Sequence, residues 1–126
     1  MKVFDSSAVL AAIFAEPGAE MVAKLWSEGT NLLCAVNYAE VIAKLNERGM
    51  SESDILTVME GVALEVVPFD QSAAHATGLL RQHTKALGLS LGDRACLSLA
   101  KARRAKVVTA EHIWKKLKGF DLILIR

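Results

Sequence analysis

The sequence contains few of the residues that interrupt or cross-link a chain. It has two prolines, eight glycines and two cysteines among 126 residues. So few prolines and glycines argue against an all-β fold, because such folds depend on many tight turns. Cys34 and Cys96 both lie in apolar surroundings. This favours two buried thiols in a reducing compartment over a disulfide framework.

Aromatic residues and long apolar runs are also scarce. Aromatics make up 6% of the chain, too few for a row of base-stacking side chains. The longest run without a charged residue, 29–39, has 11 residues, whereas a membrane-spanning helix needs about 20. Asp5 interrupts any signal-peptide pattern at the start of the sequence. We therefore expect a cytoplasmic protein that does not associate with a membrane.

Apolar residues, in contrast, are abundant. They account for 52% of the sequence, which excludes a disordered or low-complexity chain and predicts a large buried core. A chain of 126 residues falls within the usual size of one domain, roughly 100–150 residues. No repeat or linker divides the sequence, so we expect a single domain over residues 1–126.

The charges are unevenly distributed along the chain. Residues 1–93 carry 6 basic and 12 acidic side chains, whereas residues 94–126 carry 9 basic and 2 acidic ones. The two parts therefore have net charges of −6 and +7, although the whole chain has a net charge of only +1. A basic region of this kind suits a polyanion such as nucleic acid. A solvated helix face is the alternative that composition leaves open.

Short apolar runs alternate with longer segments of helical spacing. The runs predict strands at 2–4, 31–34, 64–67, 106–109 and 122–125. The longer segments predict helices at 6–15, 19–28, 36–48, 51–61, 70–86, 91–103 and 111–117. The strands are continuously apolar, as in sheets covered on both faces. The order therefore predicts an α/β fold, a three-layer α/β/α sandwich with a mainly parallel central sheet.

Four acidic residues lie in apolar stretches with almost no charged neighbours: Asp5, Glu40, Asp93 and Glu111. Asp5 ends the first predicted strand, and Glu40 lies about one turn into the helix after the second. Asp93 opens a helix, and Glu111 follows the fourth strand. Ligand sites of parallel sheets form beyond the carboxyl ends of the strands. We therefore expect these four side chains to meet at that edge.

Carboxylates that meet in apolar surroundings repel one another and are costly to bury without a partner. A hard divalent cation relieves this cost, and oxygen ligands favour Mg²⁺, with Mn²⁺ as a substitute. Such an ion activates water and neutralises charge on a phosphate. The three histidines, at 75, 83 and 112, fit no ligand pattern. Each acid also has a simpler interpretation, as a helix cap, a first-turn helix acid or a surface acid.

Four segments resemble, in order, the acidic motifs of PIN-domain ribonucleases, most closely the VapC-type toxins of bacterial toxin–antitoxin pairs. The third is the most specific, and the resemblance covers nearly the whole chain. The segments are Val3–Ala8, Asn37–Val41, Leu89–Ala100 and Val107–Glu111. One position departs from the pattern, because Glu111 stands where the family usually has aspartate. Its extra methylene moves the carboxylate outward by about 1.5 Å.

The resemblance implies a PIN-like sandwich, Mg²⁺-dependent cleavage of RNA, a homodimer, and inhibition by a cognate antitoxin. It also implies that Asp5, Glu40 and Asp93 hold the catalytic metal ion with help from Glu111. Glu111 would bind more loosely than the other three, or through water.

Four further residues are expected to support these acids. Ser6 and Thr109 carry hydroxyls that can orient ligands or waters. Asn37 precedes Glu40 by three positions and so shares a helix face with it. Arg94 is placed either to contact a phosphate or to pair with a neighbouring acid.

Three other functions deserve comparison. A receiver-like phosphoacceptor domain needs an aspartate at the end of its central strand, whereas the third predicted strand here runs into Pro68. A haloacid-dehalogenase-type phosphatase needs an aspartate two positions after Asp5, where this chain has Ser7. A non-catalytic PIN-like module that binds RNA or protein remains the alternative to a nuclease.

Overall fold

The computed structural model describes all residues, 1–126, and contains one five-stranded sheet. The strands are β1 (Lys2–Phe4), β2 (Asn31–Cys34), β3 (Glu65–Val67), β4 (Lys106–Thr109) and β5 (Leu122–Leu124). They pair in the order β3-β2-β1-β4-β5, and every pair is parallel. All five predicted strands are confirmed. This order differs from the 2-1-3-4-5 order of receiver domains, which excludes that alternative.

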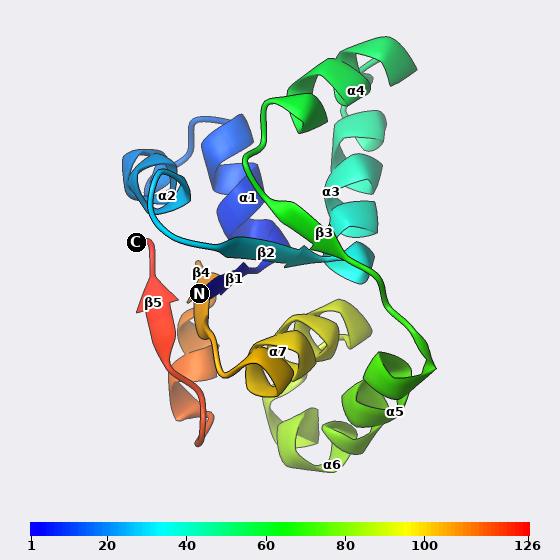
Figure 1. Cartoon of the computed structure of the whole chain (residues 1–126), viewed down its shortest axis with the longest axis vertical. Coiled ribbons are helices and arrows are strands. Elements are labelled where there is room, and N and C mark those ends of the chain that lie inside the picture. The colour runs from blue at the N-terminus through cyan, green and yellow to red at the C-terminus, as the bar shows by residue number, and fades with distance from the viewer.

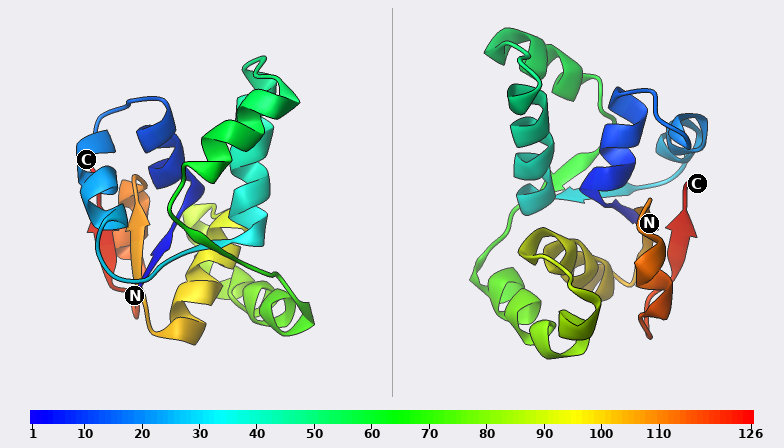
Figure 2. Two further views of the ribbon diagram at one scale, coloured as in Figure 1. Left: turned by 45° about the horizontal axis from the view of Figure 1, so that its top comes forward. Right: turned by 180° about the vertical axis from the view of Figure 1, so that it is seen from behind.

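The helices cover both faces of the sheet. They are α1 (Ser6–Ile13), α2 (Ala19–Trp26), α3 (Ala35–Glu47), α4 (Glu52–Glu60), α5 (Gln71–Leu79), α6 (Arg81–Thr84) and α7 (Leu91–Arg103), with 3₁₀ helices η1 (Lys85–Leu87) and η2 (His112–Lys116). In Figure 1, α1–α4 lie above the sheet and α5–α7 lie below it. Figure 2 shows that α3 stands upright on the sheet and carries α4 at its far end. The predicted three-layer α/β/α sandwich is confirmed.

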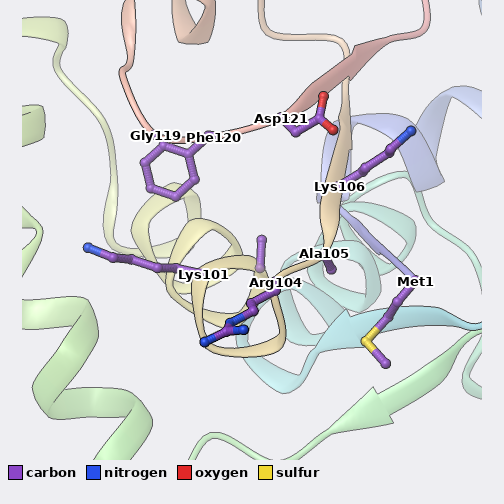
Figure 3. Close-up of a pocket in the computed structure, with 9 residues that line it drawn as sticks. Met1, Lys101, Arg104, Ala105, Lys106, Gly119, Phe120 and Asp121 are labelled. Carbon is purple, nitrogen blue, oxygen red and sulfur yellow. The ribbon is translucent and has the colours of Figure 1, made fainter.

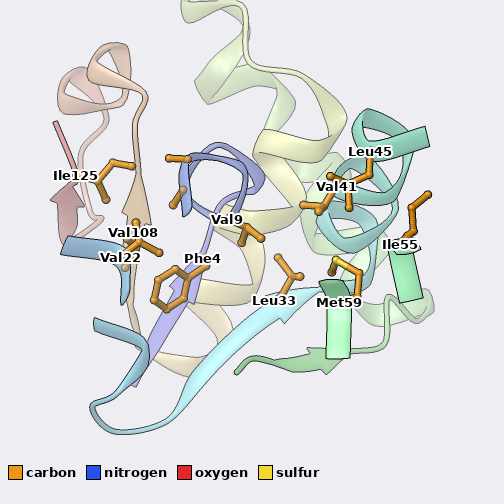
Figure 4. Close-up of a cluster of buried hydrophobic side chains, with 12 residues drawn as sticks. Phe4, Val9, Val22, Leu33, Val41, Leu45, Ile55, Met59, Val108 and Ile125 are labelled. Carbon is orange, nitrogen blue, oxygen red and sulfur yellow. The ribbon is translucent and has the colours of Figure 1, made fainter. Parts of the chain in front are cut away.

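Two hydrophobic clusters explain why the strands are continuously apolar. Successive strand residues point to opposite faces of a sheet. One residue of each central strand packs with α1–α4 (Figure 4): Phe4, Leu33 and Val108. The preceding residue of each strand packs with α7 and η2 on the other face: Val3, Leu32 and Val107. Both faces of the sheet are therefore buried.

Two predicted helices differ from those in the structure. The long helix expected over 70–86 is divided into α5, α6 and η1. Gly78 has low helix propensity, and the Thr84 hydroxyl donates a hydrogen bond to the Leu80 carbonyl at 2.8 Å, a bond that bends helices. The segment expected as a helix over 111–117 forms the 3₁₀ helix η2 instead.

Two other expectations concern the cysteines and the membrane. Cys34 and Cys96 are both buried and free, as predicted, and burial raises the pKa of each thiol. None of the helices combines the length and the apolar character that crossing a bilayer requires.

Candidate active site

The direction in which strands are added to the sheet reverses between β1 and β4. The chain runs from β1 through β2 to β3 on one side and then crosses back to β4 on the other. Ligand sites form where the strand order reverses in this way. Asp5 follows β1 directly, and Thr109 ends β4. The Thr109 hydroxyl donates a hydrogen bond to Asp5 Oδ2 at 3.1 Å, which joins residues 104 positions apart.

Asp5 is a buried carboxylate with incomplete hydrogen bonding. Only 2% of its surface is exposed. Its pKa is raised from 3.8 to about 6: burial is the main cause, the nearby carboxylates of Asp93 and Glu40 add to the rise, and hydrogen bonds from Ser7 and Thr109 oppose it. Its Oδ1 atom is buried and has no partner. A buried polar atom without a partner is costly, so this oxygen is available to a ligand.

The second acid, Glu40, is held by side chains from α1 and α3. Its Oε1 accepts hydrogen bonds from Asn37 Nδ2 at 2.8 Å and from the Ser6 hydroxyl at 3.2 Å. The same Asn37 nitrogen lies 3.0 Å from the carbonyl oxygen of Gly92, to which it also donates. Asn37 is fully buried, so it ties α3 to the beginning of α7. Asn37 therefore lies on the same helix face as Glu40, as its spacing predicted, whereas Ser6, expected to orient ligands or waters, donates to Glu40.

Gly92 allows the first turn of α7 to lie directly against Glu40. A Cβ atom at this position would overlap the carboxylate of Glu40. Gly92 is therefore required for close approach rather than for an unusual backbone conformation. Because Gly92 has no side chain, the Glu40 carboxylate can lie against the turn of α7 that also carries Asp93.

Asp93 caps the helix that carries it. Its Oδ2 accepts from the Ser90 backbone N–H at 2.9 Å, and its own N–H donates to the Ser90 hydroxyl at 3.2 Å. This reciprocal pair is a capping box, which stabilises a helix start. Asp93 is therefore a first-turn acid that stabilises the start of α7, as the simpler interpretation proposed. Its charge nevertheless acts on the pKa of Asp5, so Asp93 also belongs to the carboxylate group.

Glu111 stands apart from the other three acids. It follows β4 at the same edge of the sheet, but its side chain is exposed. Its backbone N–H donates to the Thr109 hydroxyl at 3.0 Å, and its charge is not among those that act on the pKa of Asp5. The structure therefore brings together Asp5, Glu40 and Asp93, with Glu111 at the rim.

Sequence comparison identifies the family of this fold. A model of the PIN domain matches residues 2–119. The chain belongs to the PIN-domain family. No curated protein sequence matches it.

Three solved structures that are similar to this fold are toxins or toxin–antitoxin complexes. A toxin–antitoxin complex from Klebsiella pneumoniae has a TM-score of 0.77 at 16% identity and covers 100% of this chain and 98% of its own. VapBC2 from Rickettsia felis, bound to a promoter DNA fragment, has a TM-score of 0.77 at 19% identity, over 98% and 97%. VapC20 from Mycobacterium tuberculosis, a sarcin–ricin loop cleaving toxin, has a TM-score of 0.73 at 12% identity. The match covers 95% of this chain and 96% of VapC20.

The donor atoms of this PIN domain suit a hard cation, although they are not yet arranged around one. No group of three or more His, Cys, Asp or Glu side chains converges closely enough to hold a metal ion. One oxygen of Glu40 and one of Asp93 are engaged in hydrogen bonds. Oδ1 of Asp5 is without a partner, and no salt bridge neutralises any of the three acids. The second oxygen of each of these two carboxylates accepts no hydrogen bond within the protein.

Arg94 has a structural contact. Its Nη1 atom donates to the Thr77 carbonyl at 3.2 Å, which links α7 to α5. It forms no salt bridge, so the expected pairing with a neighbouring acid is not present. The prediction that Arg94 contacts a phosphate remains untested.

Two hydroxyl residues of the site were not predicted from the sequence. Ser7 donates to Asp5 Oδ2 at 2.6 Å and accepts from the Ala110 N–H at 3.0 Å, so it connects the ends of β1 and β4. Its position two residues after Asp5 is too common a pattern to reveal this role. Ser90 could have been found, because Ser90 and Asp93 have the S-x-x-D spacing of a capping box.

Proposed function

We propose that this PIN-domain protein is a metal-dependent endoribonuclease that acts as the toxin of a toxin–antitoxin pair. The observation that carries the proposal is the group of three carboxylates, Asp5, Glu40 and Asp93, with no salt bridge and with one buried oxygen unpartnered. The cleavage of RNA by VapC20, which shares the fold, supports RNA as the substrate.

In this proposal Asp5, Glu40 and Asp93 hold Mg²⁺, which Mn²⁺ can replace. The bound ion supplies a water of lowered pKa and neutralises charge on the phosphate. Glu111, exposed at the rim, assists from the substrate side. The reaction is hydrolysis: water loses a proton and adds in line to phosphorus, the P–O bond opposite it breaks, and the leaving oxygen takes up a proton to become a hydroxyl.

The surrounding residues hold the carboxylates in position. Ser7 and Thr109 fix Asp5, and Ser6 and Asn37 fix Glu40. Because burial raises the pKa of Asp5 to about 6, the ionised form that binds a cation predominates only above that pH. Activity at low Mg²⁺ concentration should therefore rise as the pH passes through this range, because protons and the cation compete for the same oxygens.

Cleavage of a structured RNA tests the proposal. The purified protein should cut the RNA with Mg²⁺ or Mn²⁺ and stop when a chelator is added. Asp93→Asn keeps the shape and the cap but removes one charge, so it should lose nearly all activity. Cutting that continues in excess chelator would contradict the metal mechanism.

A non-catalytic PIN-like module is the second candidate. It is favoured by the capping role of Asp93 and by the lack of a preassembled metal site. Binding of RNA or a partner protein without any cleavage by the wild-type chain, at any Mg²⁺ or Mn²⁺ concentration, would support this alternative.

Gly92→Ala separates activity from stability. The new Cβ should displace the flexible Glu40 carboxylate, and alanine favours a helix over glycine by up to about 1 kcal/mol. The variant should therefore unfold at nearly the wild-type urea concentration yet cut RNA at least about 10-fold more slowly. Wild-type activity in a folded Gly92→Ala protein would show that the position of Glu40 does not matter. Gly78→Ala, in α5 with open space around it, is the matched control.

The proposal includes two protein partners, a cognate antitoxin and a second copy of this chain. The similar structures from Klebsiella and Rickettsia are toxin–antitoxin assemblies. A groove between α3 and α4 has a volume of about 690 Å³ and is lined by Tyr38, Ile42, Ile55 and Leu56 among others. Apolar side chains of an antitoxin segment would suit this groove.

Size-exclusion chromatography with light scattering tests the homodimer.

Production of the chain without an antitoxin should arrest the growth of the host cell. An unrestrained ribonuclease degrades cellular RNA, whereas Asp93→Asn should not. Growth curves of two strains that make equal amounts of each protein provide the measurement. Equal growth of both strains would count against a toxin.

A further inference from the structure

A basic surface lies at the opposite end of the molecule from the acids. Two adjoining hollows of about 430 and 470 Å³ share Lys101, Gly119 and Phe120. We call this the basic hollow, and its basic side chains are His83, Lys101, Arg104, Lys106, Lys116 and Lys118. Figure 3 shows part of it, with Lys101 and Arg104 on one side and Asp121 on the other.

The position of the basic hollow is set by the amino ends of the strands. Met1 precedes β1, Lys106 begins β4 and Asp121 precedes β5, and all three line the hollow. The acid site is at the carboxyl ends of the same strands. Met1 and Asp5 are four positions apart, which corresponds to roughly 13 Å of extended chain. The basic hollow is therefore a surface separate from the carboxylates.

The cations of the basic hollow are not neutralised by the protein. The salt bridges of the structure join Lys44 to Glu47 and Arg126 to Glu16, and neither involves this surface. Asp121 is the one carboxylate among the lining residues. Closely spaced like charges without counter-charges create a positive potential that attracts polyanions.

Arg104 occupies a backbone conformation that usually requires glycine. It forms the C-cap of α7 with φ 52° and ψ 42°, in the left-handed region where glycine is preferred. Most other residues, arginine included, are strained there. A glycine at this position would relieve the strain and remove the charge at the same time.

We propose that the basic hollow binds the phosphate backbone of the RNA substrate, away from the site of cleavage. This inference rests on the proposed nuclease function and identifies how the substrate is held. Lysine and arginine at the rim of an open hollow suit phosphates, and the half-buried Phe120 offers a ring against which a base can lie. A polypeptide partner would favour the apolar groove between α3 and α4, because protein interfaces depend on buried apolar anchors.

Salt-dependent RNA binding tests this proposal. A synthetic single-stranded RNA is titrated with the protein in excess chelator, so that binding is measured without cleavage, over a series of NaCl concentrations. Lys101→Gln and Lys118→Gln are made separately and together, and Lys24→Gln, on α2, is the control. The double variant should bind more weakly and lower the slope of log K against log [NaCl] by about 1.4, since each single-strand phosphate contact contributes about 0.7. An unchanged affinity and slope would overturn the proposal.

A second pair of variants separates binding from folding. Arg104→Gly removes both the charge and the backbone strain, so it should weaken RNA binding without lowering Tm. Ala15→Gly is the matched control, because Ala15 also has a positive φ of 53° but lies outside the basic hollow. Ala15→Gly should likewise not lower Tm, but it should bind RNA as tightly as the wild type does. Wild-type RNA binding by Arg104→Gly would count against the proposal.

The outcomes distinguish this proposal from the nuclease function. If the double variant changes the slope as expected but the wild type never cuts RNA, the basic hollow stands and the nuclease proposal fails. If the wild type cuts RNA and the double variant binds it unchanged, the basic hollow proposal fails. Loss of antitoxin binding with unchanged RNA binding would assign the surface to a protein and overturn the proposal as well.

Discussion

Asp5→Asn should lower the rate of RNA cleavage by more than about 100-fold. Residues that only orient metal ligands contribute about 10–100-fold to affinity or activity, and removal of a ligand itself should cost more. Asn keeps an oxygen that can accept from Ser7 or Thr109, so the local geometry is largely retained. The measurement is the initial rate of cleavage of one labelled RNA at saturating Mg²⁺.

Asp70→Asn is the matched control for this experiment. Asp70 caps α5 by accepting from the Ala73 N–H at 2.9 Å, and asparagine caps helices about equally well. The control should cut RNA at the wild-type rate. An Asp5→Asn rate within a few-fold of the wild type would show that Asp5 does not hold a catalytic ion.

The same Asp5→Asn substitution should stabilise the metal-free protein at neutral pH. Burial raises the pKa of Asp5 from 3.8 to about 6 in the folded state, so the folded state holds its proton more tightly than the unfolded chain does. Stability therefore falls as the pH rises from about 4 to about 6 and stays low above this range. This difference in pKa between the folded and unfolded states lowers the free energy of unfolding above pH 6 by about 3 kcal/mol at most. Asn carries no charge and escapes this penalty.

Urea unfolding of both proteins in chelator provides the test. The variant and the wild type should have similar free energies of unfolding near pH 4, and the difference should grow in favour of the variant up to about pH 7. Mg²⁺ should stabilise the wild type more than the variant, because an ion that binds only the folded state stabilises it. A difference that stays constant from pH 4 to pH 7 would mean that the pKa of Asp5 is not raised.

Much of the fold follows from local sequence patterns. The five strands are short apolar runs, and the buried pairs Val3–Phe4 and Val107–Val108 require a sheet covered on both faces. The internal structure of 70–86 did not follow, because one helical pattern is compatible with both a continuous and a broken helix. The break falls at Leu80, between α5 and α6, and helical spacing in the sequence does not show where such a break occurs.

The candidate acids could be singled out because isolated charges stand out in an apolar sequence. Asp5, Glu40 and Asp93 were identified in this way, and the parallel topology brings them to one edge. Gly92 was not identified, because its importance depends on the approach of α3 to α7 in space. The exposed position of Glu111 was also not predictable, since the turn after β4 decides where its side chain lies.

The most direct test of the three-carboxylate centre is Mn²⁺ binding measured by titration calorimetry at pH 7.5. The wild type should bind the ion at a site that Asp5→Asn and Asp93→Asn each weaken by at least about 10-fold. The double variant should be little worse than either single one, because removal of either ligand already disables the shared site. Asp70→Asn should bind like the wild type. Unchanged Mn²⁺ affinity in the double variant would contradict a metal centre built from these carboxylates.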